Sequence, residues 1–233
     1  MKFKVDTQIF EKFPGLNIGI VSAKKIDNHG ESGEIMRLIR KKEEEIRENF
    51  DTETFSLHPK IQSWRKAYLS FGAKPKKYQS SIESLNRVIL KGIDLRDINK
   101  IVNIYNYISI KYMVPVGGDD LAKVEGDIQL KFAQGNEPFT PLNSEEILTA
   151  KEGEVVYVDS KEVLCRRWNW RECDKSKMTD DTEEVVLVAE GLPPVAKGEV
   201  EKIIEELSGL VKEYCSGEVK TFILDEANRE AEI

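Results

Sequence analysis

The chain has 233 residues with a formal net charge of −7 at pH 7, and 40% of its residues are hydrophobic. Such a length suits one large domain or two small ones, and this hydrophobic content excludes extensive disorder because it can fill a packed core. The acidic balance argues against indiscriminate binding of nucleic acids, and no apolar run reaches the roughly 18 residues that a membrane-spanning helix requires.

The first half of the chain predicts one strand and four helices. Leu16–Ala23 follows a Pro-Gly turn and is rich in Ile and Val, as buried strands are. After a polar loop, apolar residues recur at helical spacing. The predicted helices cover Glu34–Phe50, Pro59–Phe71, Ser80–Leu90 and Asp97–Tyr112. We expect Asp97 to cap the last of them.

The second half changes to the two-residue alternation that is typical of strands. Alternation predicts strands around Ile128–Phe132 and Val156–Val158. Further predicted elements are strands at Val163–Trp170, Glu184–Ala189 and Val219–Leu224, a helix at Val200–Tyr214, and an acidic tail, Asp225–Ile233, that frays. The pattern indicates a mixed α/β fold in which outer helices cover a layered, twisted sheet.

A basic segment spans Lys60–Lys91, in which Glu83 is the only acidic residue. Aromatic residues lie among its charges, and lysines and arginines bind phosphates while aromatic faces stack on unpaired bases. The predicted RNA contacts are Lys66, Lys74, Lys76, Lys77 and Arg87. A pair of amphipathic helices with solvated lysines explains the same pattern, so both interpretations stay open.

Three asparagines follow one face of the helix predicted at Asp97–Tyr112: Asn99, Asn103 and Asn106. Asparagine is a poor residue for the middle of a helix, because its amide competes for backbone hydrogen bonds. A stripe of them indicates a polar lining, with Asn106 as its deepest member. The alternative is a core asparagine that braces the following turn.

A Val-Gly-Gly-Asp-Asp turn follows this helix at Val116–Asp120. Glycines at positions 117 and 118 can expose backbone amides to a ligand, as oxyanion sites require, or can simply permit a tight turn. The two aspartates can bind a cation or cap the next helix, and we favour the cap. Neither a phosphate-binding Gly-Lys-Ser/Thr loop nor a dinucleotide-binding glycine fingerprint is present.

An unusual Arg-Arg-Trp-Asn-Trp-Arg run starts at Arg166. If the run is a strand, alternation places Arg167, Asn169 and Arg171 on one face as a pocket wall, and the two tryptophans on the other as core. Arginine can hold a carboxylate or a phosphate with two hydrogen bonds. Structural ion pairing with nearby acids is the rival interpretation.

Nucleophilic catalysis and metal binding have little support in the sequence. The only histidines, His29 and His58, have no obvious Ser or Cys partner. The three cysteines form no closely spaced pair, so we predict reduced thiols in a cytoplasmic protein, with no metal and no cofactor. The N-terminal segment lacks the apolar run of a secretory signal.

The run Asn99–Asp120, continued by Gly-Asp-Ile at position 126, resembles the tRNA-binding and editing domain (B3/B4) of the phenylalanyl-tRNA synthetase beta subunit. The likeness is strongest over Val102–Tyr107, and the chain is most similar to free-standing members of that superfamily. We expect a single domain over 1–233. It divides into an N-terminal strand and outer helix (1–59), a B3/B4-like core (60–215), and a C-terminal strand and acidic tail (216–233).

The resemblance also assigns site residues. The asparagine that the family carries on its long helix falls on Asn106, whereas its histidine falls on Gly117. Its glycine-rich pocket segment falls on Arg167–Arg171, and its pocket glutamate falls on Val188. Glu190 faces the same side of the strand and is the candidate replacement.

The implied function is hydrolysis, in trans, of a wrongly attached amino acid from tRNA, by a deacylase that is not a complete tRNA ligase. The expected catalytic residues are Asn106, Gly117 and Asn169, and the expected substrate-binding residues are Asn103, Arg167, Arg171 and Glu190. We expect Asn106 and Arg167 to line one cavity.

The resemblance implies the acceptor end of tRNA as partner, an aminoacyl-tRNA synthetase as a further candidate, and neither a membrane nor DNA. Two alternatives to the hydrolase stay open. One is a non-catalytic tRNA- or RNA-binding module, or a synthetase partner. The other is a binder of a free amino acid or small carboxylate, with Arg167 as its anchor.

Overall fold

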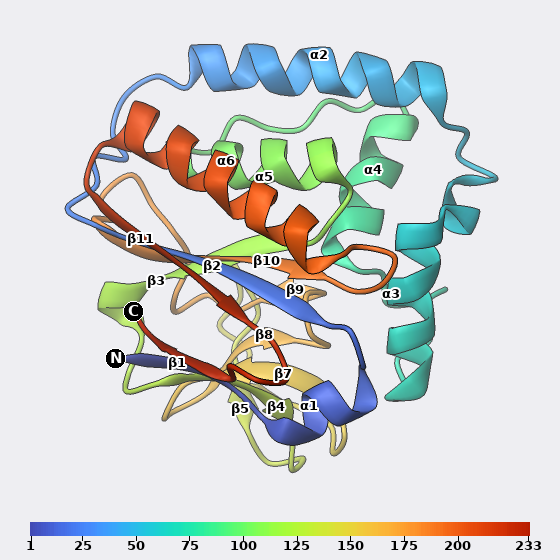
Figure 1. Ribbon diagram of the computed structural model, residues 1–233, viewed down its shortest axis with the longest axis vertical. Coiled ribbons are helices and arrows are strands. Elements are labelled where there is room, and N and C mark those ends of the chain that lie inside the picture. Colours follow the sequence, from blue (N-terminus) through green and yellow to red (C-terminus); the bar gives the residue numbers. More distant parts are fainter.

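A computed structural model describes residues 1–233 and stacks two β-sheets beneath a layer of helices (Figure 1). The upper sheet has four antiparallel strands in the order β11-β2-β10-β3. These strands are β11 (Glu218–Leu224), β2 (Asn17–Lys24), β10 (Glu184–Gly191) and β3 (Val116–Asp120). Because β3 lies at the end of this order, one of its edges is free of strand pairing.

The lower sheet has six strands in the order β12-β1-β4-β7-β8-β9. They are β12 (Glu230–Glu232), β1 (Lys2–Val5), β4 (Ile128–Phe132), β7 (Val155–Val158), β8 (Val163–Arg166) and β9 (Arg171–Glu172). Only β1 and β4 run parallel, and the other neighbours are antiparallel. A third, two-stranded sheet pairs β5 (Pro138–Phe139) with β6 (Leu148–Thr149).

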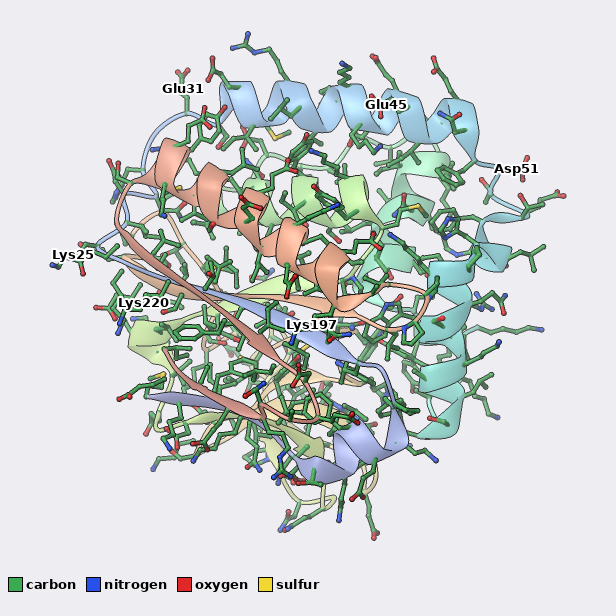
Figure 2. The ribbon with its side chains drawn as sticks, in the orientation of Figure 1. Lys25, Glu31, Glu45, Asp51, Lys197 and Lys220 are labelled. Carbon is green, nitrogen blue, oxygen red and sulfur yellow. The ribbon has the colours of Figure 1, made fainter.

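Four helices form the layer above the four-stranded sheet (Figure 1): α2 (Gly33–Asn49), α4 (Ser81–Leu90), α5 (Lys100–Tyr112) and α6 (Lys197–Cys215). Helix α3 (Pro59–Ser70) closes one side and α1 (Thr7–Lys12) lies below, while Phe55–Leu57 and Leu121–Lys123 are short 3₁₀ turns. Figure 2 shows charged side chains such as Lys25, Glu31 and Asp51 at the periphery. No helix combines the length and the apolar character that crossing a membrane requires.

Alternation along the upper sheet divides the interior into two cores. On β10, Val185 and Leu187 pack with the helices, whereas Val186 and Val188 pack with the lower sheet. A strand buried on both faces is a continuous apolar run, as this one is up to position 189. Glu190 continues the face of Val186 and Val188, so its carboxyl group enters the space between the two sheets.

The helices of the first half and most predicted strands are confirmed, with differences at their ends. Helix α5 begins at Lys100, and its cap is Asn99, whose side chain accepts a hydrogen bond from the Val102 amide at 3.0 Å. The prediction of Asp97 as the cap was wrong. Asparagine in the extended conformation seen here is as good a cap as aspartate, and it stands next to the first helical turn.

Three predictions, one of a strand, one of a turn and one of a frayed tail, needed correction. The predicted strand Val163–Trp170 ends at Arg166, because Arg167 (φ 48°) and Trp168 (φ 68°) both adopt the left-handed conformation and turn the chain. Val116–Asp120 is an edge strand instead of a turn. The tail does not fray, because β12 pairs with β1 and Ile233 is buried.

Candidate functional site

A small hollow lies between the two sheets, beside β3 and β10. Its volume is about 30 Å³, which holds one or two water molecules and is too small for an amino-acid side chain. The lining residues are Phe3, Gly117, Gly118, Asp119, Tyr157, Cys165, Trp168, Asn169, Glu172, Val188 and Glu190. We call this space the inner hollow.

Glu190 is the most heavily bonded side chain of the inner hollow. It is 3% exposed, and its carboxylate accepts hydrogen bonds from the Tyr157 hydroxyl (2.5 Å), the Trp168 indole (2.5 Å) and the Asn169 amide (2.6 Å). Burial raises the pKa of Glu190 to about 7, although these three donors act in the opposite direction. The Tyr68 hydroxyl in turn donates to the Asn169 side chain at 2.9 Å. Glu190 therefore holds the turn after β8 in place.

Arg167 lies in the same turn, and its side chain has a structural role. It is 5% exposed, and its guanidinium pairs with Glu154 at 2.8 Å. The same group lies 3.8 Å from the centre of the Tyr78 ring and 4.6 Å from that of Trp170. Cation–π and ionic contacts of this kind leave few donors for a ligand, so the structural interpretation of this arginine applies.

A wider cleft runs along the free edge of β3, between α5 and the segment 172–178. Its volume of about 370 Å³ is in the range of small-molecule sites. The residues around it are Arg96, Ile98, Val102, Tyr105, Gly118, Asp119, Leu142, Asn143, Glu172, Cys173, Ser176, Lys177 and Met178. This outer cleft shares Gly118, Asp119 and Glu172 with the inner hollow, so these three residues form the junction of the two spaces.

Two carboxyl groups meet at the junction without a cation. Burial raises the pKa of Asp119 to about 6, against a hydrogen bond of 2.5 Å from the Ser176 hydroxyl. Burial, and then the neighbouring charge of Asp119, hold the pKa of Glu172 well above its usual range. A carboxyl group with a pKa of about 6 beside a second one whose pKa is also raised is the kind of pairing that acid–base chemistry uses.

The backbone of Gly118 faces the same junction. The Glu190 amide donates to the Pro115 carbonyl, and the Asp120 amide donates sideways to the Ser176 carbonyl. In an antiparallel ladder such bonds alternate, so the amide of Gly118 points away from β10 toward the free edge. A Cβ at this position would lie 2.1 Å from the Val186 carbonyl oxygen, which explains the glycine.

The structure brings some of the predicted site residues together and separates others. Gly117, Asn169 and Glu190 all line the inner hollow. Asn106 is half-buried on α5 and lines neither space. Arg167 also lines neither, so the expected convergence of Asn106 and Arg167 on one cavity is not found.

Two further predicted binding residues have local roles. The Asn103 side chain accepts from the Ile98 amide at 3.2 Å and donates to Asp97 at 2.6 Å, which braces the start of α5. Arg171 is exposed, with its guanidinium 5.4 Å from the centre of the Trp170 ring. It precedes Glu172 directly and so lies next to the junction.

Most of the basic residues predicted to bind RNA are exposed to solvent. Four of its five predicted RNA-binding residues are exposed: Lys66, Lys74, Lys76 and Lys77. The fifth, Arg87, pairs with the buried Glu83 at 2.9 Å. Lys77 lies over the Tyr78 ring, and Tyr78 packs edge-on against Trp170 at 5.0 Å, so the lysine loop adjoins the turn after β8.

Sequence reasoning missed Glu172 as a site residue and assigned Asp119 to a cap or a cation. Position 172 is 53 residues from position 119 along the chain, and only the pairing of β8 with β9 brings it under β3. The capping role belongs to Asp120, whose side chain accepts from the Ala122 amide at 3.0 Å. No group of three or more His, Cys, Asp or Glu side chains is arranged to hold a metal ion.

Comparison with known proteins places the chain. The family model described as the B3/4 domain matches residues 63–216. The chain is 31% identical over 107 residues to the phenylalanine–tRNA ligase beta subunit of Colwellia psychrerythraea, covering 46% of this chain and 13% of that protein. It is 33% identical over 99 residues to the Fusobacterium nucleatum counterpart, covering 42% of this chain and 12% of that one.

A solved structure of an N-terminal fragment of the phenylalanyl-tRNA synthetase beta subunit from Pyrococcus horikoshii aligns with a TM-score of 0.47 and 16% identity. That alignment covers 93% of this chain and 49% of the fragment. The chain thus corresponds to only about an eighth of the length of the curated relatives it matches. Since the family model spans more than half of its residues, the chain belongs to the B3/4 domain family.

Proposed function

We propose that this chain binds the aminoacylated 3′ end of tRNA and hydrolyses the ester bond of a wrongly attached amino acid. Kinship with beta subunits of phenylalanine–tRNA ligase supports a tRNA-related role. The observation that carries the chemistry is the junction, where a backbone amide and two carboxyl groups meet between a water-sized hollow and a ligand-sized cleft.

The proposed reaction uses the junction residues in separate roles. The ionised Asp119 takes a proton from a water in the inner hollow, and the water oxygen attacks the ester carbonyl carbon in the outer cleft. The Gly118 amide donates to the oxyanion that develops. The C–O bond to the ribose then breaks, and its oxygen receives the proton that Glu172 has kept. A proton transfer from Asp119 to Glu172 restores both groups.

The RNA would approach along the basic segment. Exposed Lys74, Lys76 and Lys77 supply charge for the acceptor-stem phosphates. The partly exposed rings of Tyr78 and Trp170 supply stacking surfaces for unpaired bases. Arg171 continues this track to the residue before Glu172, so a single-stranded 3′ end has a cationic and aromatic path to the junction.

The test is a deacylation assay against a panel of mischarged tRNAs, with Asn106→Ala beside Asp119→Asn. We expect the wild-type chain to release at least one amino acid, Asp119→Asn to lose on the order of a hundredfold in rate, and Asn106→Ala to retain activity. Turnover that is lost only in Asn106→Ala would move the chemistry to the α5 amide. Tight binding of tRNA without turnover would leave the non-catalytic module, and binding of free amino acid alone would leave the third alternative.

A further inference from the structure

We infer that the outer cleft, and not the inner hollow, receives the amino-acid part of the substrate, and that it takes a bulky apolar aminoacyl group with a free α-ammonium. This inference rests on the proposed function and names the substrate class of the same site. The inner hollow has room for water only, so the side chain of any substrate must lie in the cleft.

One part of the cleft wall is apolar. Ile98 is 57% exposed and Leu142 is 41% exposed, and both line the cleft. Val102, Tyr105 and Met178 extend this surface inward. A concave apolar surface that the fold leaves uncovered is the usual mark of a binding site. The surface favours a large apolar side chain.

The carboxyl groups at the junction, which is the inner end of the cleft, favour a substrate with a free α-ammonium. Asp119 and Glu172 are near one another, and the groups that shift their pKa values include no cation. An α-ammonium at the junction would place a positive charge beside the ionised Asp119 and would bring its own ester carbonyl to the Gly118 amide. N-acylation of the amino acid would remove its positive charge. It would also add a group for which the inner hollow has no room.

One cation of the cleft wall, Arg96, is placed to bind a phosphate of a nucleotide. Lys177 is occupied by Asp174 at 2.9 Å, whereas Arg96 is exposed and lines the cleft without belonging to the inner hollow. A phosphate of the terminal nucleotide is the group that such an arginine would bind. The occupant defined by these contacts is an aminoacyl nucleotide: apolar side chain on the aliphatic wall, ammonium at the carboxyl groups and phosphate at Arg96.

Calorimetric titration of the full chain with non-hydrolysable probes tests this assignment. The probes are 3′-leucylamino-3′-deoxyadenosine 5′-phosphate, its seryl counterpart and its N-acetyl-leucyl counterpart. We expect the leucyl probe to bind at least about tenfold more tightly than the seryl probe, since burial of one leucine side chain is worth that much. It should also bind more tightly than the N-acetyl-leucyl probe, which lacks the ammonium. Ile98→Ser should remove most of the preference for leucyl over seryl. Ile147→Ser, at a 74% exposed position outside the cleft, is the matched control and should leave it unchanged.

The outcomes separate this inference from the proposed function. Equal binding of leucyl and seryl probes, or a preference that survives Ile98→Ser, overturns the cleft assignment even if charged tRNA is hydrolysed. The expected preference in binding, together with no hydrolysis of the corresponding ester by the wild-type chain, upholds the cleft and overturns the hydrolase.

Discussion

Two carboxyl sites lie on neighbouring strands of the same sheet, and they differ in what surrounds them. Glu190 on β10 is enclosed by three donors and serves the fold. Asp119 on β3 has one hydroxyl donor and an acidic neighbour, and it opens onto a cleft. The difference teaches that burial alone does not mark a functional acid. A carboxyl group whose partners are incomplete is the one left for a ligand.

The largest effect is expected from Gly118→Ala, which disturbs the backbone of β3 beside Asp119. The added Cβ would lie 2.1 Å from the Val186 carbonyl oxygen, so β3 must separate from β10. We expect a loss of about 5 kcal/mol in the free energy of unfolding, measured by urea denaturation. Gly209→Ala is the control, because nothing lies within 4 Å of its added Cβ in helix α6. It should be neutral or slightly stabilising, and equal losses in both variants would contradict the close approach at β3.

The second largest effect comes from substituting Glu190, and a substitution of Glu172 at the junction provides the comparison. Glu190→Ala leaves the Tyr157, Trp168 and Asn169 donors buried without an acceptor, and we expect it to cost about 4 kcal/mol of unfolding free energy. Glu172→Gln replaces a carboxyl group whose pKa is raised with an amide of nearly the same shape, so it should change stability by less than about 1 kcal/mol. If guanidinium denaturation gives similar losses for both, the distinction between enclosed and open carboxyl groups does not hold.

The raised pKa of Glu190 predicts a pH dependence of stability. Between pH 4.5 and 7 the unfolded glutamate has released its proton while the native one still holds it, because the native pKa is about 7. The native state binds more protons in this window, so the free energy of unfolding should fall by on the order of 3 kcal/mol as pH rises through it. Thermal or urea unfolding of Glu190→Gln across the same range should show a flatter profile than the wild type. An unchanged slope in this variant would assign the dependence to other groups.

The smallest effect concerns the RNA track. Reversal of Lys74, Lys76 and Lys77 to Glu should weaken tRNA binding about tenfold or more and flatten its dependence on salt. Filter binding at several salt concentrations measures both quantities. The matched control reverses three exposed lysines on the outer helices, Lys41, Lys202 and Lys212. Equal weakening by the two triple variants would mean that net charge, and not the basic loop, governs binding.

Much of the fold could be predicted because apolar periodicity is a local signal. The stripe in Val200–Tyr214 and the β-branched run in Leu16–Ala23 fix their elements without tertiary help. The edge strand at Val116–Asp120 could not be found in this way, since Gly-Gly-Asp-Asp has the composition of a turn and becomes a strand only by pairing with β10. The left-handed pair at Arg167 and Trp168 likewise depends on contacts with Glu154 and Glu190.

The candidate site was predictable only in part. The family resemblance pointed to Gly117, Asn169 and Glu190, and these residues do line one hollow. Asn106 carried the same motif match, yet it lines neither of the two spaces. The partnership of Asp119 with Glu172 joins residues from two different sheets, and no spacing along a single sequence encodes such a meeting.

The most direct test of the proposed chemistry is the pH profile of single-turnover deacylation for the wild type and Asp119→Asn. Since Asp119 must be ionised to accept a proton and its pKa is about 6, the wild-type rate should rise with pH through that value and then level off. Asp119→Asn should be slower by on the order of a hundredfold and should lose this rise. A variant that matches the wild type in rate and profile would show that the junction is not where the ester is hydrolysed.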